Sequence, residues 1–200
     1  MATLMRETRA LPGEIEVRSD DDGKRQVITG YAAVFGSYSQ DLGGFVEIIK
    51  PGAFRQALAE DQDVRALIDH DSRLILGRTK SGTLRLTEDD RGLHYEIDVP
   101  DTQAGRDVVT SIRRGDISGS SFSFTVRGVD GDSWREEGDR VIRELRSVDL
   151  YDVSPVTYPA YKATDASATI RALRAARQST TANSTASLRL RLIETCDDVR

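Results

Sequence analysis

Residues 118–126 read Ser-Gly-Ser-Ser-Phe-Ser-Phe-Thr-Val. Side chains alternate between the two faces of an extended strand, so Phe122, Phe124 and Val126 share one face and the hydroxyl residues between them share the other. The pattern predicts a strand with its apolar face packed in a core and its hydroxyl face on display. Serine is also common in turns and at strand edges, so a row of hydroxyl groups is equally typical of ordinary polar surface.

A helix is expected immediately before this strand. Ala104, Val108 and Ile112 recur at four-residue spacing, as on the buried face of an amphipathic helix. Thr102 is of a type that caps helix N-termini, and Gly115 suits the C-terminal cap. The helix therefore leads the chain directly into the hydroxyl-bearing strand.

Further strands are expected throughout the rest of the domain, because apolar and polar residues alternate around turn-rich segments. The expected strands are residues 14–18, 26–35, 45–49, 64–70, 84–86 and 93–99, with a further pair around 130–132 and through 141–156. Pro51 suits the first turn of a second helix through Phe54 and Leu58. Strands dominate without regular alternation with helices, which indicates a mainly β fold with peripheral helices, arranged as a mostly antiparallel barrel.

The chain of 200 residues is long enough for one compact domain with tails. Residues 1–13 show no clear period and are expected to be a variable N-terminal segment. Residues 14–162 carry the strand pattern and form the expected folded domain. From residue 163 to residue 186 the composition shifts to Ala, Ser, Thr and Arg with almost no large apolar side chains, and residues 163–200 are predicted to be a low-complexity, flexible C-terminal tail.

The amino-acid composition limits which binding partners and which cellular compartment we expect for the protein. A net charge of -5, without a cluster of Lys or Arg, argues against a nucleic-acid partner. The single cysteine, Cys196, has no partner for an internal disulfide, which fits a reducing compartment. No stretch approaches the ~20 apolar residues that span a bilayer, and residues 1–11 lack the apolar run of a secretory signal. We therefore expect a protein that is neither exported nor held at a membrane.

Only two histidines are present, which limits acid–base chemistry near neutral pH. His70 ends an apolar strand between Asp69 and Asp71, and such surroundings suit a general base. A hydrogen-bonded structural histidine at a strand end is the alternative, which the local sequence favours on its own. His94 shares its strand face with two acidic residues, so we expect a solvated face there.

A metal site at residues 69–71 is a weaker alternative. Consecutive strand residues point to opposite faces, and no second histidine lies at ligand spacing. We therefore expect no metal and no cofactor.

A serine attacks a carbonyl only when a base removes its proton and a third group orients that base. Downstream of the hydroxyl strand, Asp149 and Asp152 are the candidates for the third group. In a regular strand Asp152 points to the same side as Val148 and Leu150, and a carboxylate buried there requires a partner. The pattern leaves both acids open, together with the interpretation that they lie on a solvated strand edge.

Several of these segments resemble the prohead maturation proteases of tailed phages, a family similar in fold to the herpesvirus assemblin proteases. The resemblance runs from about residue 30 to residue 161. It rests on Gly-Tyr-Ala-Ala-Val-Phe-Gly at 30–36, Glu-Ile-Ile-Lys-Pro-Gly-Ala-Phe at 47–54, Leu-Ile-Asp-His-Asp at 67–71, Gly-Asp-Ile-Ser-Gly-Ser-Ser-Phe-Ser-Phe at 115–124 and Leu-Tyr-Asp-Val-Ser-Pro-Val-Thr-Tyr-Pro-Ala-Tyr at 150–161.

The resemblance implies a serine endopeptidase with an assemblin-like fold. It assigns Ser121, the serine directly before the first phenylalanine, as the nucleophile. It assigns His70 as the general base and Asp152 as the third catalytic residue, at a position where the family usually has glutamate. The order histidine, serine and then a third residue on a later strand also matches the assemblin-type arrangement.

The resemblance further implies that the enzyme acts inside the assembling prohead, in the host bacterial cytoplasm. Its protein substrates would be scaffold or the scaffolding segment of the major capsid protein, and often the enzyme itself. The tail after residue 163 would suit packaging or self-removal, and a homodimer follows only by analogy with the assemblin relatives. The alternative is a non-enzymatic capsid assembly or scaffold-type protein, in which the same barrel binds capsid subunits and the serines are polar surface.

Overall fold

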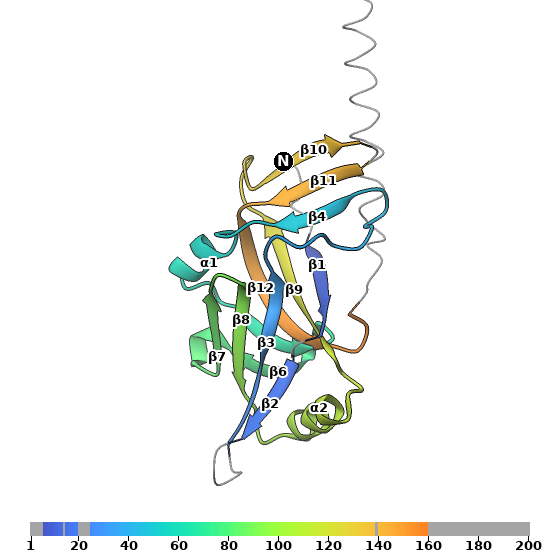
Figure 1. Ribbon diagram of the computed structural model, residues 1–200. Coiled ribbons are helices and arrows are strands. Elements are labelled where there is room, and N and C mark those ends of the chain that lie inside the picture. Colours follow the sequence, from blue (N-terminus) through green and yellow to red (C-terminus); the bar gives the residue numbers. More distant parts are fainter. Residues whose placement is uncertain (1–5, 14, 20–24, 139, 160–200) are drawn as a thin grey trace, which may run out of the picture.

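The computed structural model describes residues 6–13, 15–19, 25–138 and 140–159, so the predicted C-terminal tail lies outside the described residues. Twelve strands, two α-helices and one 3₁₀ turn make up this part of the chain. In Figure 1 the helices lie at the periphery of the strands. The prediction of a mainly β fold with peripheral helices is confirmed.

A five-stranded sheet forms the centre of the molecule. Its strands, in spatial order, are β1 (Glu7–Pro12), β9 (Gly119–Val126), β12 (Val148–Val156), β5 (Arg65–Ile68) and β6 (Asp71–Arg78). Strand β12 runs antiparallel to β9 and parallel to β5. Figure 1 shows β9 and β12 side by side through the middle of the molecule, with β1 next to β9. The hydroxyl-bearing strand is therefore an interior strand with neighbours on both sides.

Two smaller sheets flank this centre. One contains β2 (Ile15–Ser19), β3 (Gln26–Val34), β8 (Gly92–Asp98) and β7 (Leu84–Glu88), and the other contains β10 (Asp132–Glu137), β11 (Arg140–Leu145) and β4 (Val46–Ile49). The hairpins predicted within residues 14–35 and 84–99 are confirmed. The pairings among the described strands form three open sheets, so the closed barrel stays a prediction.

The helix α2 (Gln103–Arg114) has the ends that the sequence predicts. The Thr102 side chain accepts a hydrogen bond from the Gly105 nitrogen at 3.1 Å, and Gly115 ends the helix with a φ of 79°, a conformation that glycine adopts without strain. The other helix, α1 (Arg55–Ala59), is shorter than predicted. It begins after Phe54, so Pro51 lies in the preceding turn instead of in the helix. Within the described part of the chain, no helix is long and apolar enough to cross a bilayer.

Phe122 on β9 is 1% exposed and packs against two other rings, those of Phe54 and Phe124, with centroids 5.4 and 5.0 Å away. This apolar face was predicted correctly. The hydroxyl face is buried as well, contrary to the prediction that it is on display, because β1 and other chain segments cover Ser121 and its neighbours.

Strand β1 lies in the segment where the sequence shows no period. It pairs antiparallel with β9 along its whole length, a strand that the sequence analysis did not predict within the N-terminal segment. None of its six residues is fully buried. Apolar and polar residues alternate in a sequence where one face of a strand is buried. Because the edge strand β1 buries no side chain completely, it shows no such alternation, and the sequence analysis did not predict it.

Candidate active site

His70 lies in a tight turn and not at the end of a strand as predicted. Strand β5 ends at Ile68, which pairs with Asp71 at the start of β6, so Asp69 and His70 form a two-residue hairpin turn. Both have positive φ, 49° and 59°, as a type I′ turn requires. Such a conformation is uncommon for residues other than glycine and persists only where the surroundings hold it in place.

Asp69 provides part of that support. Its nitrogen donates to the Pro155 carbonyl at 3.0 Å, and its carboxylate accepts two hydrogen bonds from Thr157. Asp71, on the other side of His70, accepts instead from Arg73. Both flanking carboxylates are thus engaged by protein donors, and no group of three metal-binding side chains occurs in the chain as far as the structure describes it.

Asp152 faces the hydroxyl side of β9 because of a β-bulge. In the register between β12 and β9, Leu150 pairs with Phe124 and Asp152 already pairs with Ser123, which leaves Tyr151 as the extra residue. A bulge reverses the alternation beyond it. The prediction from regular strand parity, which put Asp152 on the apolar side with Leu150, is therefore wrong.

The structure brings the three predicted residues together. The Nε2 atom of His70 lies 2.7 Å from the Ser121 hydroxyl, and its Nδ1 lies 2.5 Å from Asp152 Oδ1. Asp152 is fully buried and also accepts a hydrogen bond from Ser154 at 3.1 Å. Asp149 contacts Gln62 and Arg127 instead. Of the two acids that the sequence left open, Asp152 is the one at the histidine.

Asp152 is held in its ionised form. Burial raises its pKa, but the hydrogen bond and charge of His70, together with Arg6 and Ser154, outweigh burial and leave the pKa below its usual value. A carboxylate in this position keeps the proton of a neutral His70 on Nδ1, so that Nε2 can accept a proton. It also stabilises the imidazolium that forms when Nε2 does so.

Three contacts of the N-terminal segment at this site were missed by the sequence analysis. The Ser121 hydroxyl donates to the Arg9 carbonyl at 2.9 Å, while the Arg6 guanidinium bonds both Asp152 and Ser123. No spacing in the sequence connects residues more than one hundred positions apart. The sequence could have indicated Ser154 as a residue of the site, since it lies two residues after Asp152 on the same strand.

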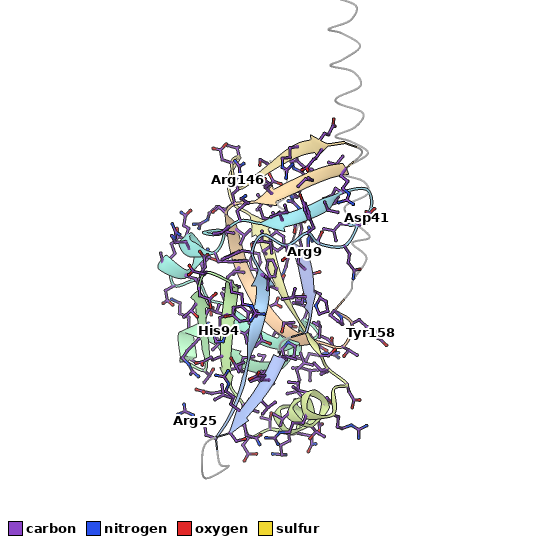
Figure 2. The ribbon with its side chains drawn as sticks, viewed as in Figure 1. Arg9, Arg25, Asp41, His94, Arg146 and Tyr158 are labelled. Atoms are coloured by element: carbon purple, nitrogen blue, oxygen red, sulfur yellow. The ribbon has the colours of Figure 1, made fainter. Side chains whose placement is uncertain are left out.

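The other residues considered from the sequence lie elsewhere. Ser120, directly before Ser121 in sequence, bonds the buried Tyr95 hydroxyl at 2.7 Å. His94 lies on the four-stranded sheet, as Figure 2 shows, where it bonds Thr29 and packs edge-on against Tyr31. Neither Ser120 nor His94 is among the residues that bond His70 at the site.

A buried serine hydroxyl, hydrogen-bonded to a histidine whose second nitrogen meets a buried carboxylate, has the arrangement of the catalytic triads found in serine hydrolases. The sequence profile of the caudovirus prohead serine proteases matches residues 13–179, and the chain belongs to this family. The family that the sequence resembled is thereby confirmed.

Two known proteins are similar to the chain. The prohead protease of Enterobacteria phage HK97 is 29% identical over 150 residues, which is 74% of this chain and 61% of the phage protein. The chain thus spans less than two thirds of that relative's length. The structure of the bacteriophage T4 capsid assembly protease, gp21, matches with a TM-score of 0.49 and 14% identity, over 78% of this chain and 97% of that one.

Proposed function

We propose that this chain is a serine endopeptidase that cleaves capsid-assembly proteins inside the phage prohead. The observation that carries the proposal is the pair of contacts made by His70, 2.7 Å to the Ser121 hydroxyl and 2.5 Å to Asp152. Membership of the prohead protease family supports the same activity. The substrates, the acyl-transfer chemistry and the catalytic roles below all belong to this proposal.

The reaction begins when His70 Nε2 takes the proton of the Ser121 hydroxyl. The Ser121 oxygen attacks the peptide carbonyl carbon, and the tetrahedral intermediate collapses as His70 donates that proton to the leaving amine. A water molecule then repeats the cycle on the acyl-enzyme and releases the new carboxyl end. Asp152 holds His70 Nδ1 throughout and offsets the positive charge that His70 gains.

The substrates in this proposal are scaffold or the scaffolding segment of the major capsid protein. The HK97 relative is named a prohead protease, which supports proteins of the prohead as substrates. Removal of residues 163–200 by self-cleavage is part of the same proposal. The assemblin-like barrel and a homodimer remain predictions that go with it.

The test is incubation of the purified chain with its capsid and scaffold proteins, followed by mass spectrometry. We expect defined fragments with the wild type and none with Ser121→Ala. The matched control is Ser37→Ala, an exposed serine on a loop, which should cleave like the wild type. If Ser121→Ala cleaved as well as the wild type, a residue other than Ser121 would be the nucleophile. If the wild type cleaved no protein even within assembled proheads, the alternative of a non-enzymatic capsid assembly protein would be favoured.

A further inference from the structure

Strand β1 lies directly over the proposed nucleophile. Ala10 is paired with Ser121 in the antiparallel register, and Ser121 is only 2% exposed. Attack requires a substrate carbonyl carbon about 3–3.5 Å from the serine oxygen. On the side of Ser121 that faces β1, the neighbouring group is the Arg9 carbonyl, whose oxygen lies 2.9 Å from the Ser121 hydroxyl oxygen. The Arg9 carbonyl therefore lies as close to the Ser121 oxygen as the carbonyl of a scissile peptide would have to come.

The Arg9 carbonyl also competes for the proton that the reaction has to move. A serine hydroxyl has one proton, and a carbonyl oxygen can only accept. His70 Nε2, at 2.7 Å, has to accept the same proton when its Nδ1 proton faces Asp152. A hydroxyl that donates to Arg9 is therefore turned away from its base.

Arg6 acts on the opposite end of the site. Its guanidinium bonds Asp152 and lies over the Tyr151 ring, 4.9 Å from the centroid. The carboxylate that should stabilise a positive charge on His70 is thereby already shared with a positive charge. Strand β1, through Arg9, and Arg6 directly before it thus contact two of the three proposed catalytic residues, each in a way that opposes their function.

The attachment of β1 to the strands β4 and β11 is made by charged side chains. Arg9 makes two hydrogen bonds to the buried Glu47 on β4, at 2.8 and 2.9 Å, and Figure 2 shows Arg9 between β1 and β4. Arg143 on β11 makes two to Glu7, at 2.7 and 2.9 Å. None of the β1 residues is fully buried, so the strand carries no completely buried side chain of its own. Segments of this kind open at lower free energy than core strands.

We propose that β1 is an intramolecular inhibitor strand that occupies the substrate's place on the edge of β9. A substrate replaces it as an extended peptide paired with β9. The inference rests on the proposed function, since it takes Ser121 as the nucleophile. It adds that the chain as folded is in a resting state, and that release of β1 is required before cleavage.

A reversible disulfide tests this in the full chain. Thr8 and Ser123 are directly opposite in the register, a distance that a disulfide spans. We would make Thr8→Cys with Ser123→Cys in a Cys196→Ser background and measure the rate at which a fluorophosphonate labels Ser121. The oxidised form should label at least tenfold more slowly than the reduced form. Equal, measurable rates in the two forms would overturn the proposal, whereas absent labelling in both forms and in the wild type would contradict the proposed nucleophile instead.

Weakening the attachment should have the opposite effect. Arg9→Ala and Glu7→Gln remove the two anchors, and each should label at least tenfold faster than the wild type. A peptide of residues 6–13, added in excess, should slow the labelling again. The control is Glu16→Gln, which removes an exposed ion pair with Arg18 on β2 and should label like the wild type. Anchor variants that are folded and label no faster than the wild type would overturn the proposal.

Failure of the proposed function would look different from failure of this inference. Capsid-protein cleavage that survives Ser121→Ala contradicts the proposed nucleophile, whatever β1 does. Cleavage between Arg9 and Ala10 in the purified chain, seen by mass spectrometry, would show that β1 is a substrate and would overturn its role as an inhibitor.

Discussion

The Asp69 carboxylate accepts hydrogen bonds from both the backbone nitrogen and the hydroxyl of Thr157, each at 2.7 Å. Thr157 immediately follows the strand that carries Asp152, and Asp69 precedes His70 in the hairpin turn. These two residues, 88 positions apart in sequence, therefore tie the turn that carries His70 to the end of the strand that carries Asp152. Asp69 is a positioning residue in this arrangement, since it acts on the site through the turn.

Substitution of Asp69 should slow the reaction without weakening substrate binding. We expect Asp69→Ala to lower kcat about tenfold or more with little change in KM, because misplacement of a catalytic group by about 1 Å costs ~100-fold. Asp69→Asn should retain more activity, since asparagine tolerates positive φ and keeps one acceptor oxygen. The matched control is Asp71→Ala, which removes a carboxylate bonded to the exposed Arg73. An Asp69→Ala enzyme with wild-type kcat would contradict the role.

The two acids left open by the sequence should differ sharply in kinetics. Asp152→Asn should reduce kcat by about 10³- to 10⁴-fold, because the amide favours the wrong tautomer of His70. Asp149→Asn, which affects contacts with Gln62 and Arg127, should keep most of the activity. Single-turnover rates and thermal unfolding of both variants separate a catalytic effect from a folding defect. Similar losses in the two variants would mean that Asp152 has no special role.

Glu7 should make a contribution to stability that depends on pH. Burial raises its pKa, but the hydrogen bonds and charges of Arg143 and Arg9 outweigh this and place the pKa below its usual value. The stabilisation is therefore complete above the unfolded-state pKa of about 4.3 and is lost as the pH falls through the lower folded-state pKa.

Accordingly, Glu7→Gln should lower the free energy of unfolding by about 1.5 kcal/mol at neutral pH. The difference from the wild type should shrink as the pH falls below about 4, where Glu7 itself becomes protonated. Urea unfolding over a pH series measures both. Glu16→Gln, at a carboxylate 67% exposed, should change the stability by no more than about 0.5 kcal/mol. A difference that stays constant with pH would argue against the ion pair.

Phe122 should be among the most important core residues. Its ring is enclosed by Phe54 and Phe124, so Phe122→Ala should cost about 3–5 kcal/mol of unfolding free energy through lost burial and the cavity left behind. Val129, 93% exposed in a loop, is the control, since Val129→Ala should stay within about 0.5 kcal/mol. Denaturant unfolding of the two variants provides the comparison, and a loss below about 1 kcal/mol for Phe122→Ala would contradict the packing.

The sequence alone determined the parts of this protein that depend on local periodicity. Alternation predicted the β9 core face, the two hairpins and the caps of α2, because those patterns reflect which side chains are buried within a single element. The resemblance to the prohead protease family added the three residues His70, Ser121 and Asp152, which no local pattern selects.

Tertiary structure alone decided how those residues meet. The β-bulge at Tyr151 turns Asp152 toward Ser123, contrary to the prediction from regular strand parity, and the type I′ turn brings His70 to Asp152 and Ser121. Strand β1 left no signal because it is held by pairing with β9 and by ion pairs to distant strands. Such contacts depend on which strands become neighbours across the sheet, and that is fixed only when the whole chain folds.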